Sequence, residues 1–209
     1  EFDIAAEVLK RGREVAVKIH DTLALGKITQ ITAILKNEQG KFEEAIELFE
    51  EAREQFELAE FKPAIEEASF QIAQTCTLAG EYQKGEKTYI KVLRFTERSD
   101  DGSEKVSILT WKLYNSFLNG DKDTQSLDEI IKLLDGISPQ DRREMESFAI
   151  TNYLLAIIHA ILKDVKSSQG FIRKAQSQLQ KRADLIEDKT ERNTFLTSLN
   201  IFRKIMEMK

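Results

Sequence analysis

Residues that break helices or crosslink chains are scarce in this sequence. Its 209 residues include two prolines, nine glycines and one cysteine, Cys76. Few prolines and glycines disfavour a strand-rich fold with many turns and favour long helices. A single cysteine excludes an internal disulfide and any zinc site built from cysteines, which fits a cytoplasmic protein. No stretch approaches the roughly 18 uninterrupted apolar residues of a membrane-spanning helix, so we expect no membrane insertion.

An excess of basic charge is also missing. The net charge is −5, with 31 Lys and Arg against 36 Asp and Glu. Nucleic acids and anionic membranes select a dominant basic surface, so neither is expected as a partner. Charged residues make up 32% and apolar residues 41% of the chain, which is too apolar for a disordered protein. The composition therefore predicts a folded, helical chain.

The side chains and loops that carry catalysis are equally sparse. His20 and His159 lie far apart, and neither forms a helical metal pair with another histidine or a nearby cysteine. His159 stands in an apolar run, where a hydrogen-bonded core histidine is the favoured interpretation. The sequence contains no glycine-rich phosphate loop. We therefore predict no enzyme activity, no catalytic residues, no metal site and no cofactor.

An internal repeat is present instead, and three glycines mark its period. Gly40, Gly80 and Gly120 follow one another at steps of 40 residues, each after an apolar helical pattern and before a charged residue. Glycine adopts the left-handed backbone of a helix C-terminus without steric cost. Each of the three therefore predicts a helix end.

Side chains on both sides of these glycines repeat at the same step. After Gly40 the order is aromatic, small, aromatic, small, and after Gly80 it recurs with valine in the last place. Positions three, four and seven apart share one helix face, so a small residue beside an aromatic one leaves room for a neighbouring helix. The two sets are Phe42, Ala45, Phe49 and Ala52, then Tyr82, Gly85, Tyr89 and Val92.

With Ala33 before Gly40, this pattern resembles the tetratricopeptide repeat family. Ala73 takes the place of Ala33 in the second copy. The period is longer than the common form and is similar to that of kinesin light chains and of bacterial regulators of the MalT and Rap types. The resemblance implies an all-α, right-handed superhelical stack of antiparallel helix hairpins, about ten helices in all, that binds proteins.

We predict one domain over residues 1–209. Because stepping back 40 residues from the first copy gives Phe2, Ala5, Leu9 and Gly12, the chain is expected to open on the second helix of a truncated repeat, as a fragment of a larger regulatory protein. The predicted parts are that helix at 1–25, helix pairs at 26–62, 63–102, 103–137 and 138–188, and a C-terminal capping helix at 189–209.

The resemblance also implies where a partner binds. The family lines its concave groove with the first helices of the repeats, and the matching positions mix apolar with polar residues. Two interpretations stay open for the aromatic ones: they contact a partner's helix or peptide, or they pack between repeats. The implied partner-binding residues are Lys27, Gln30, Ile34, Glu67, Phe70, Gln74, Thr110, Tyr114 and Phe117.

The second helices carry opposite charges in successive repeats. The acidic set Glu44, Glu47, Glu51 and Glu54 occupies the repeat positions of Lys84, Lys87, Lys91 and Arg94. We favour an ion-pair ladder on the surface, worth under about 1 kcal/mol per pair. The alternative is a basic stripe of Lys84, Lys87, Lys91, Arg94 and Arg98 that binds an acidic partner.

These patterns predict a non-catalytic interaction or scaffold domain whose partner is another protein or peptide. Two alternatives stay open. The first is a structural module that associates with copies of itself. The second is a regulatory domain that senses a peptide or a small molecule by changing the pitch of its superhelix.

Overall fold

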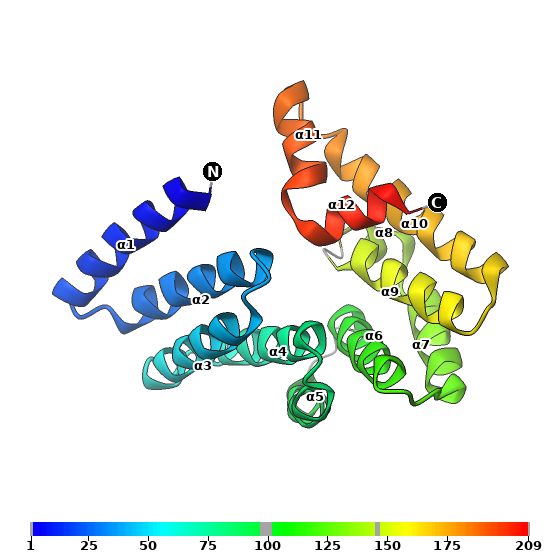
Figure 1. Ribbon diagram of the computed structural model, residues 1–209, viewed down its shortest axis with the longest axis horizontal. Helices are drawn as coiled ribbons and strands as arrows, with labels where there is room; N and C mark the ends of the chain where they lie inside the picture. The colour runs from blue at the N-terminus through cyan, green and yellow to red at the C-terminus, as the bar shows by residue number, and fades with distance from the viewer. Residues whose placement is uncertain (1, 97–101, 145–146, 209) are drawn as a thin grey trace. The chain divides into compact units, whose positions relative to one another are not determined.

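The protein is built from α-helices, as the computed structural model shows for residues 2–96, 102–144 and 147–208 (Figure 1). Within these ranges there are twelve helices and no strands, which confirms the predicted all-α stack of hairpins. None of the helices described there is long and apolar enough to cross a membrane. The helices are α1 (Phe2–Lys18), α2 (Thr22–Glu38), α3 (Phe42–Leu58), α4 (Lys62–Ala79), α5 (Tyr82–Thr96), α6 (Gly102–Leu118), α7 (Thr124–Gly136), α8 (Pro139–Glu144), α9 (Phe148–Ile161), α10 (Val165–Ala183), α11 (Lys189–Ser198) and α12 (Asn200–Glu207).

The chain divides into two compact units. An N-terminal unit spans Glu1–Phe95 and a C-terminal unit spans Thr96–Lys209. In the N-terminal unit, α2 packs against both α1 and α3, and α3 packs against α4 (Figure 1). In the C-terminal unit, α6 packs against α7 and α9, α9 pairs with α10, and α12 contacts α9 and α10.

Small residues make the helix contacts of the N-terminal unit. Ala33 of α2 and Ala45 of α3 are fully buried in one cluster with Phe49. A Cβ atom added to Gly26 would lie 2.6 Å from a ring carbon of Phe56, which is itself fully buried. The predicted alternation of bulky and small side chains is therefore what lets α2 and α3 approach closely.

The helix ends fall at regular intervals. Gly40, Gly80 and Gly120 have φ angles of 75°, 81° and 95°, so the three predicted left-handed helix ends are confirmed. His20 and Glu60 adopt the same backbone, with φ angles of 56° and 51°. In the N-terminal unit the chain thus reverses at positions 20, 40, 60 and 80.

The first turn lies earlier than the predicted boundary between residues 25 and 26. The chain leaves α1 after Lys18, where the N–H groups of His20 and Asp21 bond to the carbonyls of Val17 and Ala16. The Asp21 carboxylate then accepts a hydrogen bond of 2.8 Å from the Ala24 N–H and caps α2. A side-chain cap that the glycine pattern does not contain therefore sets this boundary.

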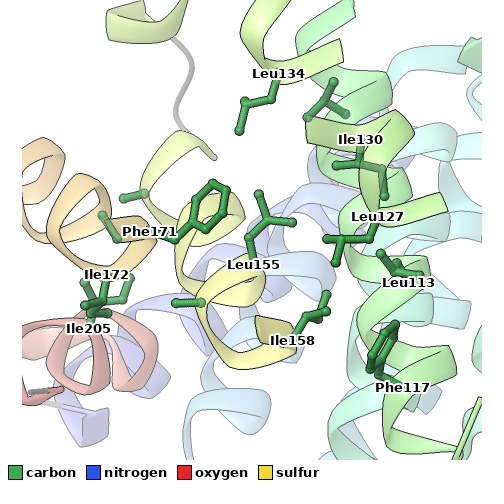
Figure 2. Close-up of a cluster of buried hydrophobic side chains, with 14 of the residues drawn as sticks. Leu113, Phe117, Leu127, Ile130, Leu134, Leu155, Ile158, Phe171, Ile172 and Ile205 are labelled. Atoms are coloured by element: carbon green, nitrogen blue, oxygen red, sulfur yellow. The ribbon is translucent and has the colours of Figure 1, made fainter. Parts of the chain in front are cut away.

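Bulky aliphatic and aromatic side chains fill the C-terminal unit. Figure 2 shows Leu113 and Phe117 of α6 in one cluster with side chains of α7, α9, α10 and α12. The predicted capping helix at 189–209 is two helices, because Leu199 is extended between α11 and α12. That bend lets α12 bury Ile205, and the Gln176 amide donates to the carbonyls of Ile205 and Met208 at 3.0 and 2.8 Å.

Candidate partner-binding site

The first helices of two successive repeats, α2 and α4, lie side by side. The Gln30 Nε2 atom donates a 2.8 Å hydrogen bond to Gln71 Oε1, and Gln71 Nε2 donates to Glu67 Oε1 at 3.4 Å. Gln30 is buried, so this bond holds its amide inside the joint between the helices. Since positions 30 and 71 differ by nearly one repeat step, the two helices run parallel with matching positions adjacent.

Apolar side chains stand open to solvent beside this amide pair. Ile31 is 48% exposed on α2, and Leu78 is 41% exposed on α4. Ile34 and Gln74 are half-buried, and Ile34 packs against the cluster around Ala33. We call this surface the first-helix face, which consists of Lys27, Gln30, Ile31, Ile34, Glu67, Gln71, Gln74 and Leu78.

Charged groups lie toward the N-terminal end of the first-helix face. Lys27 is exposed, and its ammonium group lies 6.0 Å from the centre of the Phe61 ring, within the range of a cation–π contact. Glu67 is also exposed and occupies the same repeat position on α4. The face therefore presents a cation on one helix and an anion on the next.

Phe70 lies in a contact between helices. Its ring meets Tyr89 of α5 edge-on, with 6.3 Å between ring centres and 66° between planes. Tyr89 is fully buried, its hydroxyl lies 2.9 Å from the Thr77 hydroxyl, and burial raises the pKa of the phenol. This contact joins the first and second helices of one predicted repeat, and Phe70 itself is half-buried.

The three remaining predicted residues lie on α6, in the C-terminal unit. Thr110 is fully buried and donates its hydroxyl to the Val106 carbonyl at 2.8 Å. Phe117 is 4% exposed and belongs to the core (Figure 2). Tyr114 is half-buried and meets Trp111 edge-on, with 6.1 Å between ring centres. Because α7 and α9 both pack on α6, Thr110 and Phe117 have no surface to offer a partner.

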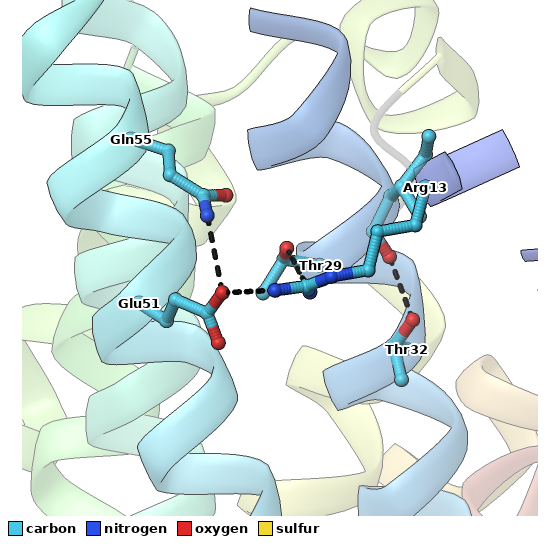
Figure 3. Close-up of polar contacts among 6 residues, drawn as sticks. Arg13, Thr29, Thr32, Glu51 and Gln55 are labelled. Atoms are coloured by element: carbon cyan, nitrogen blue, oxygen red, sulfur yellow. Dashed lines mark hydrogen bonds and ion pairs between the residues drawn. The ribbon is translucent and has the colours of Figure 1, made fainter. Parts of the chain in front are cut away.

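The acidic residues of α3 pair with several different helices. Arg13 of α1 reaches across α2, where it lies 3.2 Å from the Thr29 hydroxyl, and meets the Glu51 carboxylate at 2.7 Å (Figure 3). Lys36 of α2 lies 2.6 Å from Glu44, and this bond lowers the pKa of the carboxyl. Part of the predicted acidic row thus holds neighbouring helices together.

Lys84 forms one ion pair between second helices, as the predicted surface ladder of ion pairs requires. Its ammonium lies 3.2 Å from the Glu50 carboxylate, which joins the second helices α5 and α3. Partial burial opposes the charge, but the hydrogen bond and the charge of Glu50 outweigh it and raise the pKa of Lys84. Lys87, Lys91 and Arg94 are exposed, and Arg98 lies outside the described residues. The basic stripe thus divides into one ion-paired residue and three exposed ones.

The remaining polar candidates from the sequence lie in the interior. His159 is 8% exposed, stacks on Phe171 with 5.2 Å between ring centres, and its Nδ1 atom lies 3.2 Å from the Asp164 carboxylate. Cys76 is fully buried, and burial raises the pKa of its thiol to about 11. Among the described residues, no group of three or more His, Cys, Asp and Glu side chains could hold a metal ion.

Sequence reasoning did not select Ile31 as a contact residue. The available signal was its helical spacing, four residues after Lys27 and three before Ile34, which places all three on one face of α2.

Comparison with known proteins supports the repeat assignment. The family model described as "Tetratricopeptide repeat" matches residues 32–98. No curated protein matches the sequence. One similar solved structure, from Podosopora anserina, is described as "putative kinesin light chain nearly identical TPR-like repeats". It is 13% identical with a TM-score of 0.61, and the match covers 90% of each chain. Repeats of this family are typically non-catalytic and mediate protein–protein interactions. Residues 32–98 therefore carry the tetratricopeptide repeat pattern, and the fold is similar to that of TPR-like repeats.

Proposed function

We propose that the protein is a scaffold that binds a helical segment of another protein on the first-helix face of its N-terminal unit. The observation that carries this proposal is the Gln30–Gln71 hydrogen bond, which fixes α2 beside α4. A preformed joint of this kind lowers the cost of ordering the site when a partner binds. The exposed apolar residues Ile31 and Leu78 then supply area that a partner removes from water.

The spacing of these two residues suggests the shape of the partner. Ile31 follows Gln30 directly, whereas Leu78 lies seven residues beyond Gln71 on the parallel helix. Leu78 is therefore offset from Ile31 by six residues of helix, or about 9 Å. An amphipathic helix that presents apolar residues at positions i and i+7 would reach both contacts, with the Gln74 amide between them.

Charge fixes the direction of the bound helix in this proposal. Lys27 and Glu67 both lie toward the N-terminal end of the face, one on each helix. A partner that carries an acid and a base at one end of its apolar stripe would pair with both. Such pairs at the rim contribute mainly to specificity and to the rate of association.

Affinity capture followed by mass spectrometry tests the proposal. The bait is the chain itself, compared with the variant Ile31→Glu/Leu78→Glu. Both side chains are already exposed, so the variant should keep its helicity and melting temperature. We expect the principal captured protein to be lost from the double variant by tenfold or more, because a charge would enter each apolar contact.

Leu58→Glu is the matched control. Leu58 is 78% exposed on α3, so it repeats the same chemical change on a second helix of the same unit. The control should capture the same protein as the unchanged chain. Equal capture by all three baits would contradict the assignment of the first-helix face, as would equal loss from the control.

A further inference from the structure

A polar contact closes the joint between the second helices α1 and α3. Arg13 of α1 reaches across α2, lies 3.2 Å from the Thr29 hydroxyl and meets the Glu51 carboxylate of α3 at 2.7 Å (Figure 3). The Gln55 amide donates to the same carboxylate at 3.1 Å. A cation on one second helix and an acid on the next thus hold this joint.

The next joint, between α3 and α5, has equivalent positions but different charges. The repeat step of 40 residues holds in the structure, because the turns at 20 and 60 and those at 40 and 80 share a left-handed backbone. The equivalents of Arg13, Thr29 and Glu51 are Arg53, Ser69 and Lys91. A lysine therefore stands where the first joint has its carboxylate.

Arg53 lacks the partners that Arg13 has. Within the part of the chain that the structure describes, it meets Glu57 of its own helix at 3.5 Å, and its buried Nε atom has no hydrogen-bond partner. The Ser69 hydroxyl donates to the Ile65 carbonyl at 2.7 Å, so its oxygen can still accept. A buried donor without an acceptor is costly, and an anion beside Arg53 would supply one.

Two more cations continue the row along α5. Lys87 lies four residues before Lys91 and Arg94 three residues after it, so the three share one side of the helix over about 10 Å. All three are exposed, and none pairs with an acid among the described residues. This exposure belongs to the repeat position. The equivalents Glu47 and Glu54 are exposed on α3 as well, although α3 packs against both α2 and α4.

We propose that Arg53 and Lys91 bind a carboxylate of another protein in the place that Glu51 takes at the first joint, and that Lys87 and Arg94 extend this site along an acidic segment. Charge complementarity selects the occupant. On a chain of net charge −5, the row attracts an acidic segment locally, while the remaining surface repels nucleic acids and anionic membranes. The site lies on the second helices, so it goes beyond the proposed function of the first-helix face.

Fluorescence anisotropy with a labelled oligoglutamate peptide tests the site. The unchanged chain should bind this peptide, more weakly as salt is added, and should not bind the matching oligoglutamine peptide. Lys91→Glu should lower the affinity tenfold or more, because its carboxylate would occupy the anion position from within. Lys10→Glu is the matched control, since Lys10 is exposed on α1 and the net charge changes equally. The control should keep nearly all of the affinity.

Three results would contradict this site. The first is an equal affinity of the unchanged chain and Lys91→Glu for the oligoglutamate peptide, or no binding by either. The second is an equal loss in Lys10→Glu, which would show that net charge alone governs binding. The third is binding to phosphatidylserine vesicles without binding to the peptide, which would assign the row to a membrane surface.

Thermal melting tests the anion position without any partner. In Lys91→Glu the new carboxylate should meet Arg53 as Glu51 meets Arg13, so the melting temperature should rise by about 2 °C. With Arg53→Gln already in place, Lys91→Glu should give no such rise. An unchanged or lower melting temperature in Lys91→Glu alone would show that positions 53 and 91 do not share a site, and would overturn the proposal.

The acidic-segment site and the first-helix face can be tested apart. Lys91→Glu leaves the first-helix face unchanged and should still capture the principal partner. Ile31→Glu/Leu78→Glu should still bind the oligoglutamate peptide. Loss of peptide binding in that double variant would place the peptide on the first-helix face and overturn the site on the second helices alone.

Discussion

The two units of the molecule solve the same packing problem with different side chains. In the N-terminal unit, helices approach through alanine and glycine, as where Ala45 packs near Ala33 and Gly26 meets Phe56. In the C-terminal unit, the core is a continuous cluster of bulky side chains such as Leu155 and Phe171 (Figure 2). The family model matches residues 32–98, where the small residues recur.

This difference explains why the repeat pattern is easier to recognise in the sequence of the N-terminal unit than in that of the C-terminal unit. A small residue at a close crossing has few replacements, because any added atom meets the facing helix. A bulky cluster tolerates exchange among Leu, Ile and Phe as long as the total volume is kept. Close crossings therefore leave a strict pattern in a sequence, whereas large cores leave only hydrophobicity.

Truncating the bulky core should have the largest effect. Phe117→Ala should lower the free energy of unfolding of the C-terminal unit by about 3–5 kcal/mol, because it removes a buried ring and leaves a cavity. Trp111, the only tryptophan, is 5% exposed in that unit, so its fluorescence reports unfolding there. Circular dichroism should still show helix at denaturant concentrations where the fluorescence has changed. Coincident transitions would mean that the two units unfold together.

Enlarging a small residue should break the N-terminal unit. Gly26→Ala should cost about 1–3 kcal/mol, because the new methyl group would lie 2.6 Å from the buried Phe56 ring. Gly170→Ala is the control in the C-terminal unit. No heavy atom lies within 4 Å of its new methyl group, so helix propensity should add up to about 1 kcal/mol of stability. Urea titrations followed by circular dichroism measure both, and a change of the same sign would contradict the comparison.

Substitutions at two equivalent turns, one that ends in glycine and one that does not, should change stability in opposite directions. Gly40→Ala should cost about 1 kcal/mol, because alanine is strained at a φ of 75°. Glu60→Gly should add stability of up to about 1 kcal/mol, because glycine relieves the same strain at 51°. Melting temperatures should therefore move in opposite directions. A loss in Glu60→Gly would show that the glutamate side chain stabilises its turn.

The ion pair between second helices should have the smallest effect. The Lys84 and Glu50 side chains are 45% and 41% exposed, so we expect a coupling energy of about 0.5 kcal/mol between them. A double-mutant cycle with Lys84→Ala and Glu50→Ala measures it, and added salt should reduce it. A coupling of zero would leave Lys84 as available to an acidic ligand as Lys87.

Much of the fold could be predicted from the sequence because glycine and alanine are placed strictly. Gly40, Gly80 and Gly120 predicted three helix ends, and all three are confirmed. His20 and Glu60 end helices with the same backbone, but ordinary residues at such positions carry no recognisable signal. Burial was harder to predict. Periodicity places Phe117 on a first helix, but it does not show that α7 and α9 both cover that helix.

The even spacing of the reversals gives the N-terminal unit a modular length. A block cut at two like turns, such as positions 20 and 60, begins and ends with the backbone travelling the same way. Copying or excising such a block would add or remove one hairpin while the flanking helices keep their direction and their neighbours' spacing. Gene duplication could therefore lengthen this array by whole hairpins, because each added hairpin would begin and end at a turn that its neighbours already fit.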